Sequence, residues 1–153
     1  MSPKLNTYID VELAQLHQLR AEHRPLLLKV RTAAPDGIER SAIAAMLHSF
    51  YTGVENLFKR IAIECDGNPP AGPTWHRALL DSMVKPTAAR PAVLSGALHA
   101  RLAEYLQFRH VFRQAYSFQL RWEKMQSLVF DCETVLADLE TELRKWLAEM
   151  GNR

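Results

Sequence analysis

The feature that most constrains the fold is a long stripe of apolar residues in the second quarter of the chain. Its members follow one another at intervals of three or four residues without interruption: Ile43, Leu47, Phe50, Val54, Leu57, Ile61 and Cys65. Because this period matches one face of an α-helix, the stripe predicts a helix with one buried side. Asp36 and Glu39 predict its N-terminal cap, and Gly67 predicts its C-terminal end. A helix of this kind must pack against others, which favours an all-α fold.

Prolines divide the rest of the chain into helices and loops. Pro25 interrupts a first helix, expected from Leu5 to about Val30, because proline lacks an N–H donor and disfavours helical dihedrals at Arg24. The other expected elements are loops at 68–73 and 86–91, a short helix at 74–85, and helices at 95–116 and 122–150, with Thr74 and Ser95 as N-caps. We therefore expect an up-and-down bundle of four long helices and one short helix, forming a single domain over residues 1–153.

Composition excludes several classes of protein. Hydrophobic residues make up 48% of the 153 residues and charged residues 24%, which is ordinary for a globular domain. Cys65 and Cys132 lie on apolar stripes without metal-ligand spacing, so we expect reduced core residues and neither a metal nor a cofactor. No run approaches the roughly 18 apolar residues of a membrane span, and the N-terminus lacks the apolar core of a signal peptide. The expectation is a cytoplasmic protein without a membrane partner.

One arginine occupies a position where the helical pattern predicts a hydrophobic residue. Arg109 bridges a seven-residue gap in the apolar stripe of the 95–116 helix, whose members are Leu98, Leu102, Tyr105, Phe112 and Tyr116. Burying a guanidinium group is costly unless it is paired or faces a ligand. Either Arg109 lies on the helix flank with Glu55 as its salt-bridge partner, or it belongs to a functional site.

The segment around Arg109 is also the most basic part of the chain. The net charge of the whole chain is only +2, which is too small to indicate nucleic-acid binding by itself. Between residues 101 and 121, however, four arginines are opposed by Glu104 alone. If this segment binds nucleic acid, Arg101, Arg113 and Arg121 beside Arg109 are the candidate contacts for its phosphates.

Within this segment Arg109 is followed by four residues, Gln114, one residue and Tyr116. The order resembles the HepT-like members of the HEPN superfamily, all-α ribonuclease toxins whose motif is Arg, four residues, His, one residue and Tyr. Gln114 stands where the family has its histidine. The resemblance covers most of the chain and includes residues 48–51, 55–56, 75–77 and 109–113.

The resemblance implies metal-independent RNA cleavage, in which a 2′-hydroxyl attacks the adjacent phosphorus. Such a reaction needs one group that moves protons near neutral pH and a cation that stabilises phosphoryl charge. Arg109 suits the second role, whereas the amide of Gln114 cannot exchange a proton in this range. The candidate catalytic residues are Arg109, Gln114 and His110. Three interpretations stay open: Gln114 is an inactivating substitution, it is a natural loss that leaves an RNA-binding or regulatory protein, or His110 has taken over proton transfer.

Helix geometry bears on how such a site is assembled. Positions 110 and 114 lie about 100° and 140° from position 109 around a regular helix, so neither side chain meets Arg109 within one straight helix. The site must therefore form where the helix ends or across a symmetric interface. The family builds its cleft in a dimer, and the resemblance accordingly implies a homodimer.

The resemblance also implies a partner enzyme and a wider cleft. The partner is a minimal nucleotidyltransferase antitoxin that attaches nucleotides to Tyr116, a residue whose ring otherwise closes the core. Glu55 and Asn56 are candidate cleft-lining residues, while His76 is expected to be a packing residue. The alternative function is a non-catalytic helical module that binds RNA or a partner protein with the same dimer and basic groove.

Overall fold

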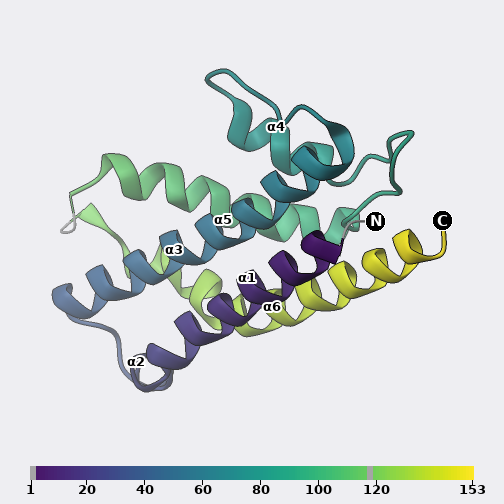
Figure 1. The fold of residues 1–153 in the computed structure, drawn as a ribbon. Helices are drawn as coiled ribbons and strands as arrows, with labels where there is room; N and C mark the ends of the chain where they lie inside the picture. Colours follow the sequence, from purple (N-terminus) through teal and green to yellow (C-terminus); the bar gives the residue numbers. More distant parts are fainter. Residues whose placement is uncertain (1–2, 117–118) are drawn as a thin grey trace.

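The computed structural model describes residues 3–116 and 119–153. Regular secondary structure in these ranges is helical, apart from one isolated bridge between Thr87 and Arg90. The elements are α1 (Pro3–Glu22), α2 (Arg24–Lys29), α3 (Gly37–Ile61), a π-helical turn η1 (Ala62–Asp66), α4 (Trp75–Ser82), α5 (Gly96–Gln114) and α6 (Trp122–Gly151), as Figure 1 shows. The predicted all-α class is confirmed. None of these helices is both long and apolar enough to cross a membrane.

Helix α3 is the centre of the bundle. It contacts α1, α4, α5 and α6, and its apolar stripe is fully buried from Ile43 to Ile61. Helices α1 and α6 run side by side on one flank of α3, while α4 and α5 cover the other (Figure 1). Burying one large apolar side chain stabilises a fold by about 1.5–3 kcal/mol, so this stripe contributes much of the cohesion.

The predicted caps of α3 and α5 are present. The Asp36 carboxylate accepts a hydrogen bond from the Glu39 backbone N–H at 2.8 Å, and the Glu39 carboxylate accepts one from the Asp36 N–H at 3.1 Å. Ser95 Oγ accepts a bond from the Leu98 N–H at 3.1 Å. Gly67 ends the π-helical turn with φ of 84°, a left-handed conformation that glycine adopts without a steric penalty.

Several details differ from the sequence prediction, among them Cys65, which is only partly buried. The first helix breaks at His23, and Arg24 is already helical in α2, because Pro25 then lies in the first turn, where its missing N–H has no intrahelical acceptor. The bundle therefore has two short helices, α2 and α4, among the described residues. Helix α4 begins after Thr74 without a side-chain cap and ends at Ser82.

Tyr116 was expected to extend the apolar stripe of α5, but it follows the end of that helix and is 72% exposed. The helix expected over 95–116 ends at Gln114, and residues 117 and 118, which follow Tyr116, lie outside the described residues.

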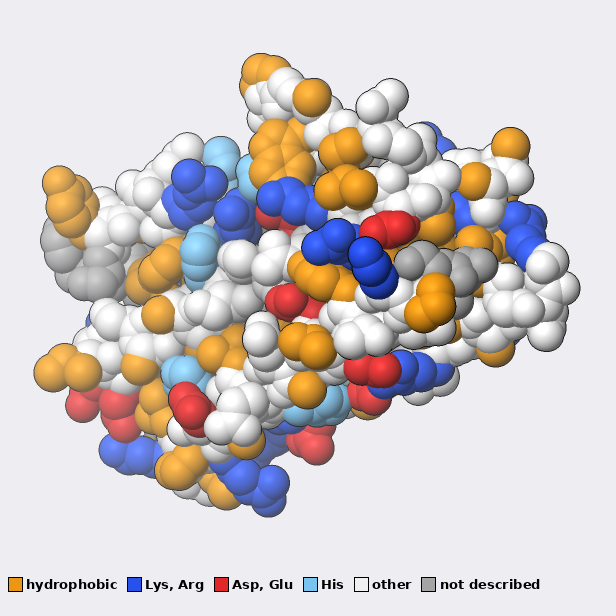
Figure 2. All heavy atoms as spheres, in the orientation of Figure 1, with side chains coloured by type: hydrophobic (Ala, Val, Ile, Leu, Met, Phe, Trp, Pro, Cys, Tyr) orange, Lys and Arg blue, Asp and Glu red, His pale blue; other side chains and the backbone are white. Residues whose placement is uncertain are grey.

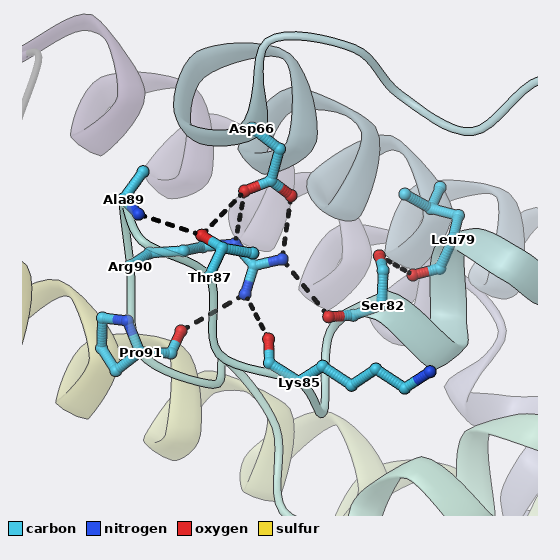
Figure 3. Close-up of polar contacts among 8 residues, drawn as sticks. All are labelled: Asp66, Leu79, Ser82, Lys85, Thr87, Ala89, Arg90 and Pro91. Atoms are coloured by element: carbon cyan, nitrogen blue, oxygen red, sulfur yellow. Dashed lines mark hydrogen bonds and ion pairs between the residues drawn. The ribbon is translucent and has the colours of Figure 1, made fainter.

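A buried arginine fixes the connection between α4 and α5 (Figure 3). Arg90 is fully buried and binds the Asp66 carboxylate with two hydrogen bonds of 3.0 and 2.9 Å. It also donates to the carbonyl oxygens of Ser82, Lys85 and Pro91. Because Asp66 ends η1 and Ser82 ends α4, these bonds hold α4 against the end of α3. This element was not anticipated from the sequence.

Candidate functional site on α4 and α5

A basic hollow of about 430 Å³ lies between the start of α4 and the second half of α5. Its charged or titratable lining residues are Arg77, Arg109, Arg113, His76, His110 and Glu104. The lining thus holds three arginines and two histidines against one carboxylate, while just outside it Asp81 pairs with Arg77 and Glu55 with His76. In Figure 2, basic and histidine side chains gather over α5 on the side of α4. This local excess of positive charge suits an anionic ligand.

One lining residue of the hollow, His76 of α4, pairs with a carboxylate of α3. Nδ1 of His76 is 2.7 Å from Oε2 of Glu55, whose side chain is only 5% exposed. An ionised carboxylate only accepts hydrogen bonds, so Nδ1 carries a proton and donates a hydrogen bond to Glu55. Nε2 is then the ring nitrogen with a free lone pair. The imidazole stacks on Trp75 with centroids 3.6 Å apart, which fixes its plane.

Arg109 lies next to this pair. Its Nη1 is 3.5 Å from His76 Nδ1, and its buried Nε has no hydrogen-bond partner among residues 3–116 and 119–153. Since Glu55 accepts the Nδ1 proton, that nitrogen has no lone pair to offer the guanidinium. Glu55, suggested by the sequence as the salt-bridge partner of Arg109, is thus bound by His76. Arg109 lines the hollow, so its guanidinium group can meet a ligand there.

The pKa values of two residues on α3, His48 and Tyr51, are shifted by burial and by charged groups in or beside the hollow. Burial, reinforced by Arg109 and Arg113, lowers the pKa of His48, so its ring is neutral at pH 7. Burial and the negative charge of Glu55 raise the pKa of Tyr51 far above its usual value. Within the described parts of the chain the Tyr51 hydroxyl is buried without a hydrogen-bond partner.

The sequence-predicted site residues are only partly brought together. Arg109, His110 and Arg113 line the hollow, and Glu55 binds His76 beneath it. Gln114 is exposed at the last turn of α5 and is not a lining residue.

Three further candidates lie elsewhere. Arg101 binds Asp138 of α6 at 2.6 Å, and Arg121 is exposed before the start of α6. Asn56 lines a different hollow, between α1 and α3, and donates to Glu12 at 3.5 Å.

Sequence reasoning assigned His76 to packing and missed its place in the site. The signal that identifies it is its bond to Glu55, a residue 21 positions away, and no local spacing reveals that bond. A second missed contact braces α4 on α5: Asp81 accepts hydrogen bonds from Arg77 at 3.1 Å and from His99 at 2.7 Å. Among the described residues, no group of three His, Cys, Asp or Glu side chains is arranged to hold a metal ion.

Together, the fold and the site define an all-helical bundle protein with a basic hollow beside its central helix. A family model described as HepT-like protein matches residues 42–150, which is more than two thirds of the chain. The chain therefore belongs to the HepT-like family of the HEPN superfamily, as its motif residues predicted. Comparisons with curated proteins and with solved structures gave no match.

Proposed function

We propose that this protein is the toxin of a toxin–antitoxin pair and a metal-independent endoribonuclease, with the basic hollow as its RNA site. The observation that carries the proposal is the gathering of Arg77, Arg109 and Arg113 around one cavity in a chain whose net charge is only +2. A guanidinium group can bind two phosphate oxygens at once, which suits a phosphodiester in the hollow. We place the protein in the cytoplasm as a homodimer, controlled by a minimal nucleotidyltransferase antitoxin.

Gln114 limits the cleavage that we expect. An amide neither accepts nor releases a proton near neutral pH, and loss of a general acid–base commonly lowers the rate by about 10² to 10⁴. The second candidate function is therefore a non-catalytic module that binds RNA or a protein in the same hollow. The exposure of Gln114, outside the lining of the hollow, favours this alternative.

RNA binding tests the proposed use of the hollow. We expect Arg109→Gln and Arg113→Gln each to weaken binding of a fluorescent single-stranded RNA and to lower the slope of log affinity against log salt by about 1. Arg24→Gln is the matched control, because it removes the same charge from an exposed position on α2. Fluorescence anisotropy measures both quantities. Equal weakening by all three variants contradicts the assignment of the RNA site to the hollow.

Cleavage separates the toxin from the non-catalytic module. We expect Gln114→His to cleave RNA faster than the starting protein in EDTA and to inhibit bacterial growth more strongly. A gel assay with labelled RNA measures the rate, and circular dichroism verifies that both proteins are folded. If both proteins bind RNA and neither cleaves it, the nuclease function fails and the binding module is supported.

A further inference from the structure

We propose that His76, oriented by Glu55, is the proton-transfer residue of the hollow, supplying the function that Gln114 cannot. This inference rests on the proposed function, because it assigns a role in RNA cleavage at the same site. The family motif places proton transfer on α5, at Gln114 or His110. We place it on α4 instead, at a histidine that a carboxylate of α3 holds in position.

The hydrogen bond to Glu55 gives His76 the tautomer that a general base needs. The 2.7 Å contact directs the Nδ1 proton toward a carboxylate that is almost fully buried, which leaves the Nε2 lone pair for a ligand. The same carboxylate stabilises the imidazolium ion that forms when Nε2 takes up a proton. A buried acid that orients a histidine in this way is a recurring arrangement in hydrolytic enzymes.

The other histidines are less suited to this role. His23 is not a lining residue of the hollow, and its Nδ1 lies 2.8 Å from the carbonyl oxygen of Leu19. His17 and His99 use Nε2 to bind Glu140 and Asp81, each at 2.7 Å. His48 lines the hollow between α1 and α3 instead. His110 lines the same hollow as His76 but is exposed, and no carboxylate in the described ranges orients its ring. His76 therefore combines an oriented ring, a place in the hollow and a neighbouring arginine.

The reaction that this arrangement supports balances without a metal or a co-reactant. Neutral Nε2 of His76 removes the proton from a ribose 2′-hydroxyl as the 2′-oxygen bonds to the adjacent phosphorus. Arg109 binds the non-bridging oxygens, where negative charge increases. The bond from phosphorus to the 5′-oxygen then breaks, and the imidazolium returns its proton to that oxygen. The products are a 2′,3′-cyclic phosphate and a 5′-hydroxyl end.

Glu55 has a separate, positioning role with its own readout. The charged and titratable groups around the histidine are Glu55 and Lys59 on α3, Arg77 on α4, and Glu104, Arg109, His110 and Arg113 on α5. Glu55→Gln keeps an acceptor for Nδ1 but removes the negative charge that stabilises the imidazolium. We expect the acidic limb of the cleavage rate–pH profile to move to lower pH in this variant. A purely structural role for Glu55 would change stability without moving that limb.

The test measures cleavage and binding separately. Single-turnover cleavage of a fluorophore- and quencher-labelled single-stranded RNA is followed in EDTA, and binding is measured with the same RNA carrying 2′-O-methyl groups, which lacks the nucleophile. His76→Asn keeps a donor for Glu55 but removes Nε2, and His76→Gln is a second variant in case the first folds poorly. His17→Asn is the matched control, because it alters a histidine–glutamate pair of the same length on an exposed surface.

We expect each folded His76 variant to lose about 10²-fold or more in cleavage rate while its affinity for the methylated RNA is unchanged, and His17→Asn to match the wild type. Full cleavage by the His76 variants overturns the inference. So does loss of cleavage in His110→Asn with His76→Asn still active. In both cases the wild type still cleaves RNA and the proposed function stands. A wild type that binds the methylated RNA but cleaves no RNA overturns this inference, and the nuclease function fails too if Gln114→His is equally inactive; a wild type that does not bind the methylated RNA overturns the use of the hollow for RNA.

Discussion

Replacing Arg90 by methionine should strongly destabilise this protein, because it disrupts the buried polar cluster that joins the end of α4 to the end of η1. The guanidinium is fully buried and makes five hydrogen bonds, two to Asp66 and three to backbone carbonyls (Figure 3). Methionine has a similar length, so the cavity is small and the main effect is electrostatic. Asp66 loses its counter-ion, and three carbonyl oxygens lose a donor.

The size of the effect follows from the burial of the pair. Removing one partner of a buried ion pair costs about 3–5 kcal/mol, because the other charge remains desolvated. The Asp66 side chain keeps 18% of its exposure and regains some hydration, which places the estimate near the lower limit. For a chain of this size, about 3 kcal/mol corresponds to a fall of roughly 6–12 °C in melting temperature.

Urea denaturation followed by circular dichroism measures this change in the free energy of unfolding. Arg144→Met is the matched control, because Arg144 also pairs with an aspartate, Asp10, but is 46% exposed. An exposed pair contributes at most about 1 kcal/mol, so the control should be nearly as stable as the wild type. The double variant Asp66→Asn with Arg90→Met should lose less than the sum of the single changes, since no unpaired charge is left.

If Arg90→Met lowers the free energy of unfolding by less than about 1 kcal/mol, or by as much as Arg144→Met, the buried Arg90 cluster does not stabilise the fold as we infer. Such a result would mean that water or a local rearrangement satisfies Asp66 and the carbonyl oxygens when the guanidinium is absent.

Three further predictions concern assembly, modification and pH. Light scattering at micromolar concentration should give twice the chain mass of 17.5 kDa. A monomer would contradict a site that forms across a symmetric interface. A cognate nucleotidyltransferase with ATP should add AMP to Tyr116, which is 72% exposed, and Tyr116→Phe should abolish the adduct. Peptide mass spectrometry locates the adduct, and finding it on the buried Tyr51 or Tyr105 would contradict the prediction. The pKa of His48 is lowered in the folded state, so the unfolded chain binds more protons below pH 6.5 and stability falls as the pH drops through that region. Urea titrations at several pH values should show a weaker fall for His48→Asn, and an unchanged fall would exclude His48 as a cause.

The helices were predictable because their signals are local. The apolar stripe from Ile43 to Ile61 and the caps at Asp36 and Ser95 depend on residues three or four positions apart, which a single helix brings together whatever surrounds it. The family was predicted from the motif from Arg109 to Tyr116 together with similar segments over most of the chain, and the match over residues 42–150 confirms it. The N-terminal break was misplaced by about one residue because proline is compatible with the first turn of a helix as well as with its end.

The candidate site depended on contacts that only the packed bundle creates. Glu55 meets His76 across 21 residues, and Asp66 meets Arg90 across 24, because α4 folds back onto the end of α3. Neither pair has a spacing that distinguishes it from an exposed charge or a packing histidine. The amino-acid order alone is enough to identify the helical segments, from short-range patterns, and the family, from similar segments spread over most of the chain. Which polar groups are buried together depends on the packing of separate helices, because that packing sets their desolvation and pairing.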